Sequence, residues 1–128
     1  MPETFPEEVR TLVATHIQSV EQLEMLLLLN EHLNRAWTSE EVAAELRIDA
    51  MSAASRLQDL SARGFLAHNS GSYRFRADND ELRRAVAALA EAYRDRRVSL
   101  INLIFSKPVD KVRLFADAFK LRKDESDG

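Results

Sequence analysis

Six side chains in the middle of the sequence are hydrogen-bond donors whose spacing places them on outward surfaces. They are Ser52, Ser55, Arg56, Arg63, Arg74 and Arg76. An arginine guanidinium holds its N–H groups in a planar fork, which matches the paired acceptor atoms of a phosphate or of a guanine edge. Serine hydroxyls donate to the same acceptors at shorter reach. These residue types therefore suit recognition of an anionic surface rich in acceptors.

The other polar residues form no catalytic or metal-binding pattern. His16, His32 and His68 lie in separate predicted elements, and the chain has no cysteine, which removes thiolate nucleophiles and thiolate zinc sites. The three glycines build no phosphate-binding loop, and no serine stands in a nucleophile-elbow sequence. We therefore expect no enzymatic activity, no metal and no cofactor.

Charge is distributed unevenly behind a formal net charge of −3. Residues 1–49 carry ten acidic and three basic side chains, whereas residues 50–77 carry one acidic and four basic side chains. A local basic surface is the electrostatic requirement for contacting a phosphate backbone. Four arginines on a solvated surface give the same pattern without a partner. Charge alone leaves both interpretations open.

The composition predicts one folded domain in the cytoplasm. The chain has 128 residues, 45% of them hydrophobic and 30% charged, and at this length a core forms without disulfides or a structural metal. No apolar run approaches the ~18 residues that a membrane span requires. The acidic start lacks the layout of a signal peptide. We expect no membrane partner.

Helical periodicity and capping signals divide most of the chain into helices. Capping boxes are predicted to open helices at Ser19, Thr38 and Asp78, and Asp49 is a further candidate cap. Gly64 is predicted to end a helix. The expected helices cover about residues 7–17, 19–36, 38–46, 50–63, 78–105 and 109–122.

Between residues 65 and 76 the period changes to that of a two-stranded hairpin with its turn at Ser70-Gly71. Alternation along the second strand sends an aromatic pair inward and an arginine pair outward: Tyr73 and Phe75 against Arg74 and Arg76. We expect the aromatic pair, and also Trp37, to lie in the core and not to contact a ligand.

The order helix, helix, turn, helix, hairpin, helix resembles a winged helix–turn–helix domain. Ala43-Ala-Glu-Leu46 and Leu57-Gln-Asp-Leu60-Ser-Ala-Arg-Gly64-Phe-Leu66 carry the resemblance, which covers roughly Ser19 to Arg76. It is closest to small bacterial regulators of the multiple-antibiotic-resistance (MarR) type. The implied fold class is mainly α, a winged helix–turn–helix with a two-stranded wing and additional N- and C-terminal helices for dimerisation.

The resemblance also implies a division of the chain and a turn with one departure. The expected parts are an N-terminal helical extension (1–18), the winged domain (19–77), a dimerisation region of a long and a terminal helix (78–122) and a disordered tail (123–128). The turn reads Leu46-Arg47-Ile48, with arginine where such domains often have glycine. Either this turn has a different shape or Arg47 itself faces DNA.

Residues 50–63 are the implied recognition helix for the major groove, and residues 66–76 are the implied wing on the backbone. The expected buried stripe is Met51, Ala54, Leu57 and Leu60, with Ala50 and Ala53 small enough to approach bases. Arg56 is the candidate for a bidentate guanine contact, and Arg63 is better placed for phosphate. The alternative is that Arg56 pairs with Asp59, three residues away on the same helix.

The predicted long helix over 78–105 carries a coiled-coil-like seam that we assign to dimerisation. Its apolar members are Leu82, Val86, Leu89, Tyr93, Leu100 and Leu103, and Arg96 interrupts them. In the alternative, other helices of the same chain cover this seam. A symmetric dimer would place two recognition helices about one DNA turn apart and predict a palindromic site.

The leading hypothesis is a homodimeric transcriptional regulator that binds double-stranded DNA. The alternative is a winged-helix module for protein–protein contact without DNA binding, which the overall acidity and Asp59 in the recognition helix favour. A small-molecule effector between the long helix and the winged domain is implied by resemblance, with its chemistry open.

Overall fold

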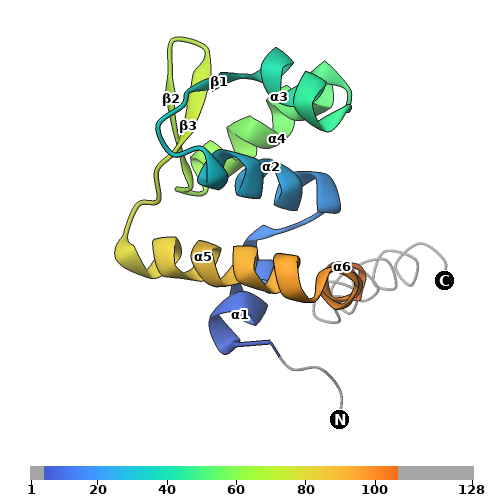
Figure 1. Cartoon of the computed structure of the whole chain (residues 1–128). Coiled ribbons are helices and arrows are strands. Elements are labelled where there is room, and N and C mark those ends of the chain that lie inside the picture. Colours follow the sequence, from blue (N-terminus) through green and yellow to red (C-terminus); the bar gives the residue numbers. More distant parts are fainter. Residues whose placement is uncertain (1–4, 107–128) are drawn as a thin grey trace, which may run out of the picture.

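The computed structural model describes residues 5–106 (Figure 1). Six helices and three short strands follow one another in the order shown in Figure 1. The helices are α1 (Glu7–His16), α2 (Val20–Glu31), α3 (Ser39–Leu46), α4 (Ala50–Ala62), α5 (Asp80–Asp95) and α6 (Arg97–Phe105), and the strands are β1 (Trp37–Thr38), β2 (Leu66–Asn69) and β3 (Ser72–Phe75). The predicted helix over 109–122 and the tail 123–128 lie outside the described residues.

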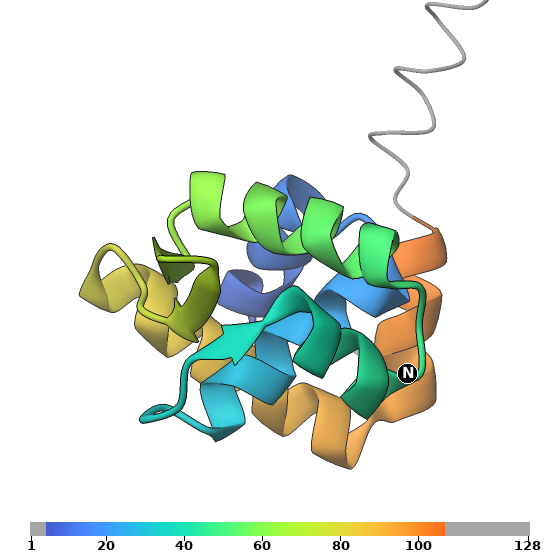
Figure 2. The ribbon, with the colours of Figure 1, turned by 90° about the horizontal axis from the view of Figure 1, so that it is seen from above.

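The elements form an upper and a lower group with α2 between them. In Figure 1, α3, α4 and the strands lie above α2, whereas α1, α5 and α6 lie below it. α4 packs against α2, α3 and β2, and α1 packs against α5 and α6. Figure 2 looks down on this upper group, with α4 along the top of the view, α3 below it and the hairpin at the left. This mainly helical fold with a small antiparallel sheet confirms the coarse architecture that the sequence predicts.

Local capping signals fix most helix starts. The side chains of Ser19, Thr38 and Asp49 accept hydrogen bonds from the backbone N–H three residues on, and the box of Thr38 is reciprocal with Glu41. The fourth cap is Asn79, not the predicted Asp78. The Asp78 N–H donates instead to the Gly64 carbonyl at 2.9 Å, which ties the entry of α5 to the end of α4.

Gly64 ends α4 as predicted, through a complete left-handed cap. Its φ is +93°, the Gly64 N–H donates to Ser61, and the Phe65 N–H reaches back to Leu60, both at 3.1 Å. These two bonds satisfy carbonyls at the helix end that would otherwise lack partners. The hairpin turn likewise has positive φ at both central residues, Ser70 and Gly71.

The sheet has three strands, where the sequence predicted two. β1 pairs antiparallel with β3, placing Trp37 opposite Tyr73, and β3 pairs with β2 to complete the order β1-β3-β2. β1 is two residues long, too short to show an alternating pattern. α2 correspondingly ends at Glu31 and not near residue 36. The β2–β3 hairpin is therefore attached by hydrogen bonds to the segment that starts α3.

The aromatic residues assigned to the core are buried as predicted. Trp37, Tyr73 and Phe75 have exposed fractions of 2%, 4% and 7%. The guanidinium of Arg35 covers the Trp37 ring at 3.5 Å from its centroid, and the His68 ring stacks on Tyr73 at 4.2 Å. No described residue accepts a hydrogen bond from Trp37 Nε1. β3 packs against α2, and its side chain Arg74 points outward and is exposed.

The predicted continuous helix over 78–105 is wrong, because it breaks at Arg96. This residue has φ −140° and ψ 60°, which ends α5 before α6 begins. The Arg96 guanidinium lies over the Phe5 ring at 4.2 Å, and α6 turns Leu100 and Ile104 into the core. Contacts with the N-terminal segment therefore accompany the break. No helix among residues 5–106 is long and apolar enough to cross a membrane.

Candidate nucleic-acid interface

The buried stripe expected on the predicted recognition helix α4 is confirmed at Leu57 and Leu60 and wrong at Met51. Ala53, Leu57 and Leu60 are fully buried, whereas Met51 is 81% exposed and Ala54 is half-buried. Positions 53, 57 and 60 recur at helical spacing, and Met51 is two residues, or about 200° around the helix, from Ala53. Met51 therefore belongs to the open face and Ala53 to the core. The open face comprises Ala50, Met51, Ser55, Gln58 and Ala62.

Two predicted contact residues of α4 share one carboxylate from α2. Glu21 Oε1 accepts a hydrogen bond from the Ser52 hydroxyl at 2.9 Å and from Arg56 Nε at 2.9 Å. The side chain of Arg56 is 33% exposed. Asp59, the partner considered from the sequence, pairs with another arginine. The sequence did not point to Glu21, because 35 residues separate it from Arg56.

Arg63 belongs to an internal polar network. Its Nε donates to Asp59 Oδ2 at 2.8 Å, and its Nη1 contacts the Thr15 carbonyl at 3.1 Å and His16 Nδ1 at 3.3 Å. Asp59 Oδ2 also accepts from the amide of Gln22, a side chain that is 1% exposed, at 2.6 Å. Burial, and then the Arg63 guanidinium, lower the pKa of His16. Arg63 thus joins α4 to α1, and its charge is compensated.

The β2–β3 hairpin with residue 76, and the turn before α4, carry arginines without a described acidic partner. Arg74 and Arg76 are exposed on either side of buried Phe75, as the alternation predicts. Arg47 is exposed and adopts the left-handed conformation with φ +59°, while the Ile48 N–H reaches back to the Ala43 carbonyl at 3.0 Å. Among residues 5–106, no hydrogen bond or ion pair engages these three guanidiniums.

The predicted dimerisation seam is largely internal. Val86, Leu89 and Leu100 have no exposed surface, and Leu82 and Leu103 are half-buried. α1 packs against both α5 and α6, so the prediction that these three buried residues meet a second chain is wrong. The described apolar side chains that do remain open on α6 are Val98, 71% exposed, and Phe105, 66% exposed.

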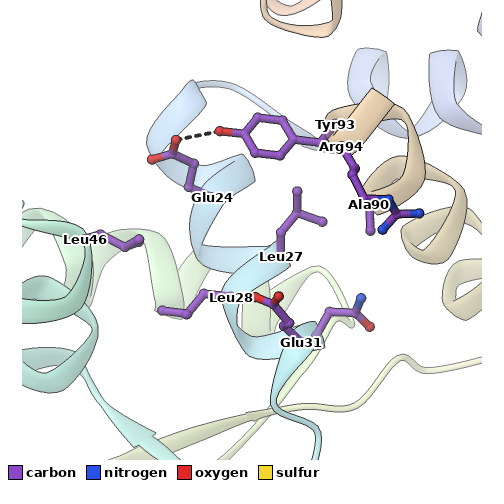
Figure 3. Close-up of a pocket in the computed structure, with 9 residues that line it drawn as sticks. Glu24, Leu27, Leu28, Glu31, Leu46, Ala90, Tyr93 and Arg94 are labelled. Carbon is purple, nitrogen blue, oxygen red and sulfur yellow. Dashed lines mark hydrogen bonds between the residues drawn. The ribbon is translucent and has the colours of Figure 1, made fainter. Parts of the chain in front are cut away.

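Tyr93, the remaining seam residue, lies in a groove between α2, α3 and α5 (Figure 3). The groove has a volume of about 550 Å³, and Leu27, Leu28 and Leu46 contribute much of its apolar lining. The Tyr93 hydroxyl donates to Glu24 Oε2 at 2.8 Å. Burial and the Glu24 carboxylate raise the pKa of Tyr93. Tyr93 therefore faces α2, and the groove is a candidate location for the predicted effector.

Within residues 5–106, no three histidine, aspartate or glutamate side chains gather as metal ligands. Comparisons with models of protein families, with curated proteins and with solved structures found no match. The class that the fold itself defines is a mainly helical domain with a three-stranded antiparallel sheet, an arrangement compatible with a winged helix.

Proposed function

We propose that the chain is a winged helix–turn–helix regulator of transcription that binds double-stranded DNA as a homodimer. α4 would enter the major groove, and wing residues 66–76 would contact the backbone. One observation carries the proposal: exposed arginines without an acidic partner among the described residues stand near α4. Arg47 precedes its N-terminus, and Arg74 and Arg76 lie on the hairpin that packs on it through β2.

The backbone of Arg47 supports this interpretation. A left-handed conformation costs a residue with a side chain about 1 kcal/mol, which glycine avoids. Among residues 5–106, the side chain makes no hydrogen bond or ion pair that would offset this cost. Backbone strain of this kind often accompanies a functional role. A phosphate contact at the start of α4 supplies that role.

The proposed homodimer would use the outer side of α6. Val98 and Phe105 are exposed on a helix composed mostly of apolar residues. These two side chains are seven residues apart and share one face of the helix, so a second chain on that face would remove both from water. A two-fold axis at α6 would present two α4 helices to DNA, and the binding site would then be palindromic.

A second candidate function is docking of α4 onto another protein. It is favoured by the charge balance of α4. Among the described residues, Glu21 pairs with Arg56 and Asp59 pairs with Arg63, so neither arginine of this segment is left without an acidic partner. Met51, 81% exposed on the open face of α4, is a flexible apolar residue suited to a protein partner. DNA binding and docking differ in their dependence on the wing arginines.

The test is fluorescence anisotropy with a labelled random-sequence duplex across a salt series. Replacing Arg74 and Arg76 together with alanine should weaken binding at least about tenfold and reduce the salt slope by about two. The matched control replaces Arg83 and Arg84, two exposed arginines of α5, and should bind nearly as the wild type does. Equal losses in both variants, or no binding at low salt, would contradict DNA binding and favour the docking function.

A further inference from the structure

Glu21 connects α2 to the two α4 side chains best suited to reading bases. Its Oε1 atom accepts from both the Ser52 hydroxyl and Arg56 Nε, each at 2.9 Å. Ser52 and Arg56 are one helical turn apart, so a single carboxylate oxygen fixes two neighbouring donors. The three side chains are partly exposed, and Ser52 and Arg56 lie on the side of α4 that faces α2.

The contact leaves the recognition end of Arg56 unused. Glu21 engages Nε, and no described residue bonds to either terminal nitrogen of this guanidinium. A bidentate contact with guanine requires two N–H groups directed at O6 and N7, and the two terminal nitrogens supply such a pair. The carboxylate thus occupies the one donor that end-on recognition does not need.

Glu21 also changes what Arg56 favours electrostatically. A free arginine near DNA is attracted to any phosphate, which strengthens binding regardless of sequence. The paired carboxylate cancels that charge and repels phosphate, while the base edge still gains from oriented N–H donors. An arginine held in one rotamer also loses less conformational freedom on binding.

We propose that Glu21 is a positioning residue that fixes Arg56 for guanine recognition and reduces its attraction to phosphate. The inference rests on the proposed DNA-binding function and names a determinant of its specificity. It predicts two effects of opposite sign when the carboxylate is removed. Binding to unrelated duplexes becomes tighter, and discrimination among sequences becomes weaker.

The experiment selects duplexes from a randomised 20-base-pair library with wild-type protein and with Glu21→Ala, Arg56→Ala and the double variant. Anisotropy then measures each protein against the selected duplex, the same duplex with one guanine changed to adenine, and a scrambled duplex. Glu21→Ala should lose about tenfold of the guanine preference, within the range of one bidentate contact. It should bind the scrambled duplex more tightly, with a salt slope steeper by about one.

Two further variants separate positioning from a structural role. Glu21→Gln keeps an acceptor oxygen for Arg56 without the charge, so it should retain most of the guanine preference while binding the scrambled duplex more tightly. Glu31→Ala removes a carboxylate that makes no described ion pair from the same helix and should change neither quantity. The double variant should match Arg56→Ala in guanine preference, because Glu21 acts through Arg56.

The outcomes distinguish this inference from the proposed function. If Glu21→Ala keeps the wild-type guanine preference, the positioning role is refuted and DNA binding stands. If Glu21→Ala binds every duplex more tightly but discriminates among them as the wild type does, the positioning role is also refuted, because Glu21 would then only weaken DNA binding in general. If the wild type enriches no sequence and binds no duplex at low salt, both are refuted. Should Glu21→Ala fail to fold, Glu21→Gln decides by its own expected result. Tighter binding of the scrambled duplex with the guanine preference retained supports the inference, and unchanged binding of the scrambled duplex refutes it.

Discussion

Replacing Gly64, which joins α4 to the β2–β3 hairpin, with alanine should lower the free energy of unfolding through two effects that can be measured separately. Gly64 has φ +93°, a conformation that side chains rarely adopt. A Cβ atom at this position would also stand 2.5 Å from Asp78 Oδ2 and 2.9 Å from Asp78 Cγ. Both distances are too short, so the Asp78 side chain must move.

The magnitude follows from these two parts. Holding a residue with a side chain in such a conformation costs roughly 1–2 kcal/mol. Displacing the exposed Asp78 carboxylate adds about 0.5–1 kcal/mol, the cost of an unfavourable rotamer. We expect a total near 2 kcal/mol, which lowers the melting temperature by about 5–10 °C in a domain of this size.

Urea unfolding followed by circular dichroism measures this cost, and two variants separate its parts. Gly71→Ala changes a residue with φ +82° and open space around it, so it should show the conformational part alone. In an Asp78→Ala background, Gly64→Ala should fall to about the same value. The reasoning is refuted if Gly64→Ala changes stability by less than about 0.3 kcal/mol, or costs the same in both backgrounds.

Three other measurements address the turn, the polar network and α6. Arg47→Gly should leave the free energy of unfolding unchanged or raise it by about 0.5 kcal/mol, because relief of the left-handed strain offsets the added entropy of the unfolded chain. Its affinity for duplex DNA should fall in anisotropy, and an unchanged affinity would show that Arg47 does not contact DNA. Burial and Arg63 lower the pKa of His16 from 6.5, so the unfolded chain binds this proton more readily than the folded chain does. The free energy of unfolding should therefore decline as the pH falls below about 6.5, until the lowered pKa of the folded state is passed. Urea titrations at several pH values should show this decline in wild type and a flatter profile in His16→Gln. Val98→Ser with Phe105→Ser should convert a dimer to a monomer in analytical ultracentrifugation, and a dimer that persists would place the contact elsewhere.

Features decided by neighbouring residues could be predicted from the sequence. Ser19, Thr38 and Asp49 each bond to a backbone N–H three residues away, and Gly64 bonds within the last turn of its own helix. Such contacts need no knowledge of the rest of the chain. The helix boundaries around the proposed recognition helix were accordingly accessible in advance.

Features decided by distant contacts could not be predicted in the same way. The break at Arg96 is accompanied by a contact with Phe5, and the compensation of Arg56 depends on a residue in another helix. The exposure of Met51 follows from how α4 is rotated against α2 and α3. Periodicity alone allowed either Met51 or Ala53 to lie in the buried stripe with Leu57 and Leu60. The burial of Val86 and Leu89 follows from α1 packing along α5. In each case tertiary packing decided between patterns that the sequence equally allows.

The short strand β1 makes the β2–β3 hairpin and the start of α3 one unit of local opening. Thr38 pairs with Ser72 in the sheet and also accepts the hydrogen bond that caps α3. If β3 detaches, the same event releases the residue that starts α3, so both segments open with one free energy. In native-state hydrogen exchange, the amides of β3 and of the first turn of α3 should therefore lose protection together.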